Sequence, residues 1–186
     1  MARSKPNDRS SRTHPAQSDR DAESELLVEL EHVFRELDAS LQADTCPAST
    51  ECCRFGITGR EPYVTSIEVA LVNRAIARRG GPRALGRAPA PLSGEASADR
   101  KDKRRLALAD EEPCPLLDAK GRCSVYDARP FGCRTYFCER ATRASGFNQR
   151  DINEFVRRIK DIAARHAAGG DLGKPLRRWL TFVRPR

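Results

Sequence analysis

Seven cysteines in two separated groups constrain this chain more than any other feature of its sequence. Cysteines that serve only as small core hydrophobes are not expected to segregate in this way. A shared partner therefore explains the grouping, and the candidates are a metal ion, an iron–sulfur cluster or disulfide bonds. The two groups are Cys46, Cys52 and Cys53, followed some sixty residues later by Cys114, Cys123, Cys133 and Cys138.

The N-terminal sequence argues against disulfides. Its first residues contain no apolar stretch of the length found in secretory signals, and no later apolar run is long enough to cross a bilayer. We therefore expect a cytoplasmic protein, whose thiols stay reduced, and seven is an odd number for a disulfide framework. These arguments favour a metal or cluster over a redox-active thiol pair or inert structural thiols.

Composition and segment boundaries predict one small domain with tails. Only 39% of the 186 residues are hydrophobic and 6% are aromatic, and a core this small is often supplemented by a bound metal. A formal charge of +8 permits contact with polyanions. The expected segments are a disordered tail (1–20), a helical first half with the upstream cysteines (21–79), a basic linker or mobile loop (80–105), the cysteine motif with a third helix (106–170) and a basic tail (171–186).

Apolar residues that recur every three or four positions predict three amphipathic helices. They are expected over residues 21–42, 65–79 and 151–168. Thr65-Ser-Ile-Glu68 is a capping box for the second helix, and a Gly-Gly-Pro sequence ends it. The expected fold class is mainly α, with irregular cysteine-rich loops and a small β-hairpin, forming a metal-stapled single domain.

Shorter patterns place the cysteines relative to one another. Asp118-Ala-Lys-Gly121 predicts a turn, and a hairpin around it would bring the cysteines on either side to the same face. The adjacent Cys52 and Cys53 point apart on an extended or helical chain, so they rarely serve one mononuclear site together. Short extended pieces are expected over residues 57–64 and 106–109, and an apolar face is expected in the C-terminal tail.

Ligand spacing leaves the kind of metal centre open. Zinc prefers a closed tetrahedron of sulfur and nitrogen ligands, whereas four cysteines also hold a cubane iron–sulfur cluster. The sequence contains no zinc-hydrolase pattern, glycine-rich phosphate loop or GxSxG elbow. His14, His32 and His166 are scattered over disordered or helical segments, so they are not expected to be ligands.

The order and surroundings of the cysteines resemble a known family. From Cys46 to Cys138, and most closely in Cys114-Pro-Leu-Leu-Asp, Gly-Arg-Cys123-Ser-Val-Tyr and Arg-Pro-Phe-Gly-Cys133-Arg, the chain looks like the YkgJ-type cysteine-cluster proteins, whose domain chelates zinc or iron. The resemblance implies that all seven cysteines belong to the metal site. They are Cys46, Cys52, Cys53, Cys114, Cys123, Cys133 and Cys138.

One position departs from the family pattern. Ser49 stands where the family has a further cysteine, so seven thiols remain in place of eight. Seven thiols cannot complete two four-ligand sites, so a water, Ser49 or a carboxylate would have to supply the eighth ligand. The other side chains expected to support the thiols are Arg54, Asp118, Tyr126, Arg129 and Arg134, since arginine beside a thiolate lowers its pKa.

Three functions remain open from the sequence. The first is a zinc- or iron-binding protein, and the second is a redox enzyme or electron carrier with an iron–sulfur cluster or an incompletely ligated iron. The third is a metal-stapled interaction module, whose basic segment 100–105 and basic tail bind nucleic acid or an acidic partner. Catalytic residues, oligomeric state and pathway do not follow from the sequence.

Overall fold

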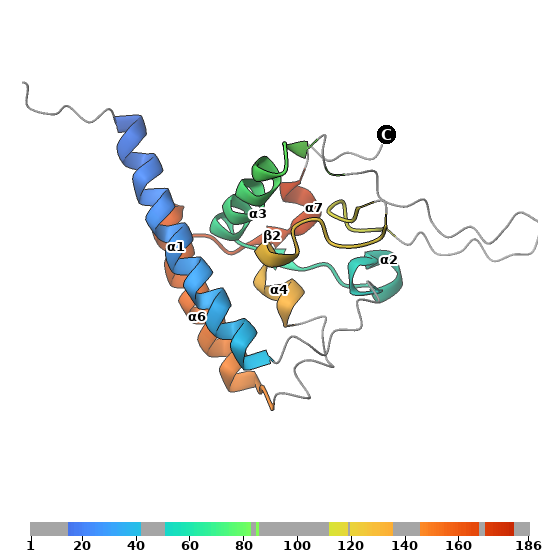
Figure 1. The fold of residues 1–186 in the computed structure, drawn as a ribbon. Helices are drawn as coiled ribbons and strands as arrows, with labels where there is room; N and C mark the ends of the chain where they lie inside the picture. The colour runs from blue at the N-terminus through green and yellow to red at the C-terminus, as the bar shows by residue number, and fades with distance from the viewer. Residues whose placement is uncertain are drawn as a thin grey trace, which may run out of the picture.

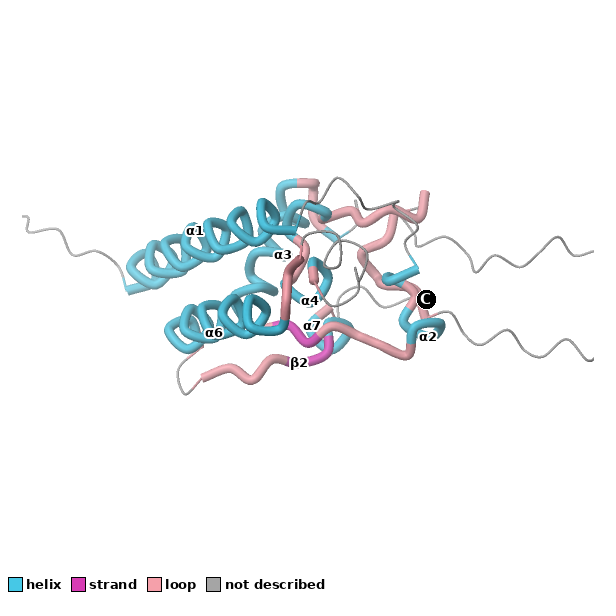
Figure 2. The backbone as a smooth tube through the Cα atoms, turned by 90° about the horizontal axis from the view of Figure 1, so that it is seen from below, coloured by secondary structure: helices cyan, strands magenta, loops and turns pink. Residues whose placement is uncertain are grey.

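Three long helices form one part of the protein. The computed structural model describes residues 15–41, 51–82, 85, 112–118, 120–135, 146–167 and 170–180. Within them, α1 and α6 lie side by side and run in opposite directions, and α3 packs against both (Figure 1, Figure 2). The three helices predicted from periodicity are confirmed as α1 (Pro15–Leu41), α3 (Ser66–Arg78) and α6 (Gln149–His166).

Capping residues at the starts of α3 and α6 bind the first backbone N–H groups of these helices, and the capping box predicted for α3 is present. Thr65 and Glu68 form the capping box at the start of α3, and Asn148 caps α6 through its side-chain oxygen. Beyond α3, Gly80 and Gly81 adopt φ angles of 97° and 87°. Glycine tolerates this left-handed conformation because it lacks a Cβ atom, so the chain can leave the helix sharply.

The first helix begins earlier than predicted. Residues 15–20, expected to belong to a disordered tail, form the first turns of α1. Proline fixes φ near the helical value, and its missing N–H would have no partner in a first turn, so Pro15 is well suited to start a helix. The rest of the predicted tail, residues 1–14, lies outside the described residues.

The one sheet found in the described part of the chain joins distant segments. Strands β1 (Tyr63–Val64) and β2 (Lys174–Pro175) pair antiparallel. This sheet is not the predicted hairpin, which instead forms a turn closed by a single bridge between Leu117 and Cys123. The single bridge is enough to close this turn, because side-chain and backbone hydrogen bonds within the turn also stabilise it.

Short helical turns fill the region between the long helices and the loops. The piece predicted to be extended over residues 57–64 begins as a helical turn, and residues 106–109 lie outside the described residues. The short helices are η2 (Glu51–Cys53), α2 (Phe55–Thr58), η4 (Tyr126–Ala128), α4 (Phe131–Arg134) and α7 (Leu176–Trp179).

The C-terminal segment docks through only part of its apolar face. Leu176 is fully buried, and the indole N–H of Trp179 donates to the carbonyl of Val64 at 2.9 Å. Leu172, predicted on the same face, is 95% exposed. The segment predicted as a separate tail is therefore partly integrated into the fold through β2 and α7.

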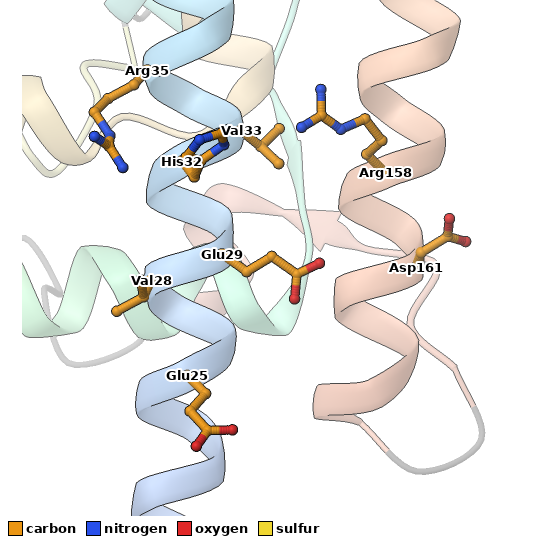
Figure 3. Close-up of a pocket in the computed structure, with 8 residues that line it drawn as sticks. All are labelled: Glu25, Val28, Glu29, His32, Val33, Arg35, Arg158 and Asp161. Carbon is orange, nitrogen blue, oxygen red and sulfur yellow. The ribbon is translucent and has the colours of Figure 1, made fainter.

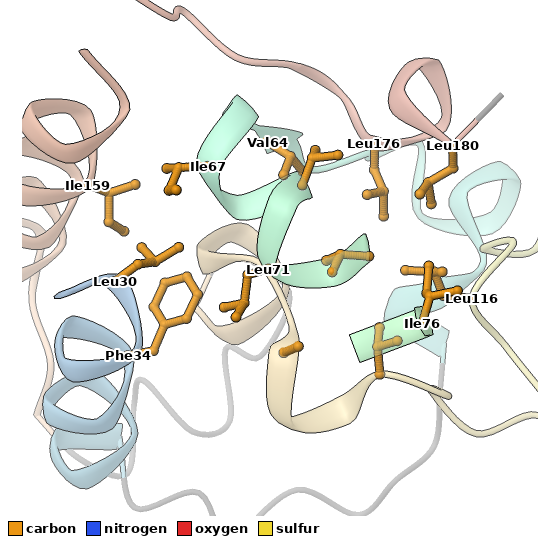
Figure 4. Close-up of a cluster of buried hydrophobic side chains, with 14 of the residues drawn as sticks. Leu30, Phe34, Val64, Ile67, Leu71, Ile76, Leu116, Ile159, Leu176 and Leu180 are labelled. Atoms are coloured by element: carbon orange, nitrogen blue, oxygen red, sulfur yellow. The ribbon is translucent and has the colours of Figure 1, made fainter. Parts of the chain in front are cut away.

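A continuous apolar core connects the helices with the cysteine-bearing loops. At one end of the core, Leu30 of α1 and Ile159 of α6 meet Ile67 of α3 (Figure 4). The other end of the core contains Leu116, which lies between Cys114 and Cys123 in the sequence, and Leu176 of α7 (Figure 4). Burial of these side chains drives the packing of both regions against each other.

Candidate metal centre

Three separate segments carry the five cysteines that the structure describes. The upstream pair lies in η2 and at its end, two more lie on either side of the turn at residues 118–121, and one lies in α4. All five are free thiols. Cys46, Ser49 and Cys138, which were also predicted to belong to the site, lie outside the described residues. The five are Cys52, Cys53, Cys114, Cys123 and Cys133.

Backbone pairing holds the upstream cysteines beside the downstream motif. The N–H of Cys114 donates to the carbonyl of Cys53 at 2.7 Å, and Arg54 forms an antiparallel bridge with Pro113. Such pairing places neighbouring backbones within about 5 Å of each other. The two groups of cysteines therefore meet, although some sixty residues separate them in the sequence.

The turn predicted at residues 118–121 is present, and Asp118 stabilises it. One carboxylate oxygen of Asp118 accepts hydrogen bonds from the N–H groups of Lys120 at 2.9 Å and Arg122 at 2.8 Å, and the bond from Arg122 is the main cause of the lowered pKa of Asp118. Gly121 adopts a φ of 73° in the turn. Asp118 thus acts on the backbone, and the turn returns the chain toward Cys123.

Arg134 connects the segment that carries Cys133 to helix α1. Its guanidinium is buried, forms an ion pair with Asp38, donates to the carbonyls of Arg129 and Asp127, and lies 4.6 Å from the ring centre of Phe34. The predicted support of a thiolate by Arg134 is not seen among these contacts. Arg134 instead ties η4 and α4 to α1.

A buried carboxylate, Glu68, connects the start of α3 to the start of α4. One oxygen accepts from both the backbone N–H and the hydroxyl of Thr65 at 2.8 Å, and the other accepts from the N–H of Phe131 at 2.8 Å. Burial raises the pKa of Glu68. The capping box indicated the first role, but no sequence signal indicated the second, which positions the turn that holds Cys133.

The five described thiols influence one another electrostatically. The sulfurs of Cys52 and Cys53 are 3.9 Å apart, and this contact, burial and the charges of Cys114 and Cys133 raise the pKa of Cys53. Burial raises the pKa of Cys114 to about 12, and the nearby Cys123 contributes in the same direction. Burial also raises the pKa of Cys133, which both Cys114 and Cys123 increase further.

These thiols are neighbours without forming a preformed metal site. Within the described ranges, no three histidine, cysteine, aspartate or glutamate side chains are arranged to hold a metal ion. Two of the seven predicted ligands lie outside those ranges, so the described part contains an incomplete ligand set.

Two arginines provide positive charge beside Cys123. Burial raises the pKa of Cys123, while Arg129 and Arg79 lower it, and Arg129 also lowers that of Cys133. Arg129 was predicted beside the thiols, and its guanidinium lies 3.5 Å from the ring centre of the half-exposed Tyr126. Arg79 was not singled out from the sequence, where it looked like an ordinary cation at the end of a helix.

The histidines have other partners. His32 Nδ1 lies 2.7 Å from a carboxylate oxygen of Glu36, and His166 Nδ1 lies 2.8 Å from the hydroxyl of Ser66. His14 lies outside the described residues. That the histidines are not metal ligands stays a prediction.

The cleft beside His32, between α1 and α6, carries charged groups from both helices. Its volume is about 430 Å³, and Figure 3 shows its carboxylates and Arg158 on the two facing helices. Glu29 pairs with Arg165 at 2.6 Å, and Arg158 pairs with Glu36 at 2.6 Å. These ion pairs join the two helices.

Comparison with known proteins found no matching family model, no matching curated protein and no matching solved structure. In the described part of the chain, no helix has both the length and the apolar character needed to cross a membrane.

Proposed function

We propose that this chain binds zinc or iron through its cysteines. The observation that carries the proposal is that the thiols of η2 meet those of the 112–123 loop and α4, which lie some sixty or more residues further along the sequence. Thiolates prefer zinc and iron–sulfur clusters over hard cations such as magnesium. The motif-level resemblance to YkgJ-type proteins supports the same ligand chemistry.

The donor chemistry of the described residues fits such an ion. A thiol that is buried beside other thiols resists ionisation, and a bound cation removes that resistance because it binds the thiolate directly. Arg129 and Arg79 would offset part of the remaining negative charge beside Cys123. The proposed ligands are Cys114, Cys123, Cys133 and Cys138, joined by Cys46, Cys52 and Cys53.

A redox function at an iron or iron–sulfur centre is the second candidate. The observation that favours it is the 3.9 Å contact between Cys52 and Cys53, which adds an upstream thiol pair to the four of the downstream motif. One tetrahedral ion uses only four ligands, so the surplus thiols are available for a second ion or for redox chemistry. The interaction module stays a prediction, since residues 100–105 lie outside the described residues.

Elemental analysis and a visible absorption spectrum test the proposal on protein purified without oxygen or added metal. We expect near-stoichiometric zinc without colour, or iron with sulfide and a brown charge-transfer band; the second result would favour redox chemistry. Cys114→Ser and Cys133→Ser should each lose most of the bound metal. Full-length protein that folds normally, contains no metal and is unaffected by Cys133→Ser would refute metal binding.

Leu116→Ala is the matched control for the two cysteine substitutions. Leu116 is 2% exposed and lies two residues from Cys114, so its truncation destabilises the same loop without removing a thiol. A folded Leu116→Ala protein should therefore keep its metal. Equal metal loss in this variant would mean that general destabilisation, rather than ligand removal, explains the cysteine results.

A further inference from the structure

A second cavity, which we call the arginine groove, lies between α1, α3 and residues 124–128. Its volume is about 430 Å³. None of the five described cysteines lines it, so it is distinct from those thiols, although Arg79 lines the groove and also acts on Cys123. Its lining is unusually rich in guanidinium groups, from Arg35, Arg74, Arg78, Arg79 and Arg134.

Carboxylates neutralise only part of this charge. Arg74 forms an ion pair with Glu31, and Arg134 forms one with Asp38. One further carboxylate, that of Asp127, lines the groove. Two ion pairs therefore account for two of the five arginines.

The other three arginines lack a carboxylate partner among the described residues. Arg35 and Arg78 are exposed, and Arg79 lies one residue beyond the end of α3. Asp127 offsets only one of these three positive charges, so the groove keeps an excess of positive charge. Such a concave, positively charged surface concentrates anions.

A buried donor in the groove also lacks a partner. The Nε atom of Arg74 is buried and has no hydrogen-bond partner in the described structure. Leaving a buried donor unsatisfied costs about 1–3 kcal/mol, and more when the group is charged. Arg74 is therefore held by Glu31 without having all of its donors satisfied.

The arginines come from two helices that face the same space. Arg74 and Arg78 are four residues apart on α3, so they lie one above the other on one face of that helix. Arg35 of α1 lines the arginine groove and also the α1–α6 cleft (Figure 3), so it lies at the border between the two. Guanidinium groups from both sides can therefore approach one anion.

We propose that the arginine groove binds a phosphorylated small molecule, with Arg35, Arg74 and Arg78 contacting the phosphate. A planar guanidinium binds two phosphate oxygens at once, and several guanidiniums suit a dianion better than a single carboxylate. The volume lies in the range of small-molecule pockets. This site is independent of the proposed metal function, because none of its residues is a proposed ligand.

Nuclear magnetic resonance on the metal-loaded, full-length protein tests the site with inorganic phosphate as the probe. We expect saturable shifts in the Nε–H signal of Arg74 and in the amides of residues 74–79 at low salt. The double variant Arg35→Gln/Arg78→Gln should weaken phosphate binding about tenfold or more, because it removes two of the three guanidinium groups proposed to contact the phosphate. Arg150→Gln, an exposed arginine on α6 outside the groove, should change it less than about twofold.

A titration with a single-stranded oligonucleotide identifies the source of the phosphate. Binding of inorganic phosphate at the groove supports the proposal whether or not the oligonucleotide binds. Binding of the oligonucleotide alone would overturn it in favour of a nucleic-acid surface. Absence of saturable phosphate shifts in the wild-type protein, or equal weakening by Arg150→Gln, would also overturn it, and the wild-type titration decides even if the double variant does not fold.

Discussion

The long helices and the cysteine-bearing loops of this protein are stabilised in different ways. The helices bury apolar faces, including Leu30 and Leu37 on α1, which are fully buried. The loops contain one-residue bridges, such as Leu117 to Cys123, and depend on a few buried polar groups. In the helices many contacts share the stabilisation, whereas in the loops single groups carry much of it.

This difference teaches where a metal would matter. Helices α1 and α6 bury an apolar interface and carry ion pairs across it, so they have their own reason to associate. The segments 51–55 and 112–135 contain little regular structure, and segments with few regular backbone hydrogen bonds open more easily than long helices. A bound metal should therefore protect the loops from hydrogen exchange more than it protects α1 and α6.

The largest expected effect comes from a substitution in the buried core of the long helices. Leu37→Ala should lower the free energy of unfolding by about 2–5 kcal/mol, because it leaves a cavity at a fully buried position. Urea denaturation of the protein as purified measures this loss. Val28→Ala on the same helix, where the side chain is 57% exposed, should change stability by less than about 0.5 kcal/mol.

The next effect separates the two regions. Arg134→Gln should lower the free energy of unfolding by about 2–3 kcal/mol, since it leaves Asp38 without its partner and removes donors from the carbonyls of Asp127 and Arg129. Hydrogen exchange should show the largest loss of protection in α4. Arg157→Gln, which removes an exposed ion pair on α6, should leave hydrogen exchange in α4 unchanged. A loss of protection in α4 equal to that of Arg134→Gln would contradict the linking role of Arg134.

Alkaline pH should weaken the metal-free loops. The pKa of Cys114 is raised by burial from 9.0 to about 12, so the folded state retains a proton that the unfolded state loses. This contribution is complete below pH 9.0 and is lost as pH rises toward 12, at up to about 1.4 kcal/mol per pH unit. Urea denaturation at pH 8 and pH 10 measures it, and Cys114→Ser should remove this part of the pH dependence.

The smallest effect concerns the surface of the helices. Arg165→Gln breaks an ion pair with Glu29 that is about half exposed on both sides. Exposed pairs contribute less than about 1 kcal/mol, so the variant should be nearly as stable as the wild type. Thermal unfolding at low and high salt checks this, and a loss as large as that of Leu37→Ala would mean that surface charges, rather than burial, hold α1 to α6.

Much of the helical fold was predictable because its signals are local. Periodic leucines predicted the buried face of α1, and the capping box of Thr65 and Glu68 predicted the start of α3. The start of α1 was placed too late because a polar tail and a polar helical turn have similar compositions. Pro15 was the signal that could have placed it.

The candidate site was predictable only in part. Spacing and the predicted turn indicated that Cys114 and Cys123 would approach each other, and the structure places their charges close enough to interact. No spacing rule indicated that Cys53 would pair with Cys114 through the backbone, because that contact depends on how the core closes. The metal itself stays a proposal.

The sequence by itself determined the long helices, the turn at Asp118 and the grouping of the thiols, since these depend on residues that are near one another along the chain. Only the tertiary structure decided that Glu68 holds α4, that Arg134 faces α1, and that five arginines line one groove. The physical reason is that a hydrogen bond or a charge acts over a few ångströms in space. Which groups reach that distance is decided when the apolar faces of α1, α3 and α6 pack together.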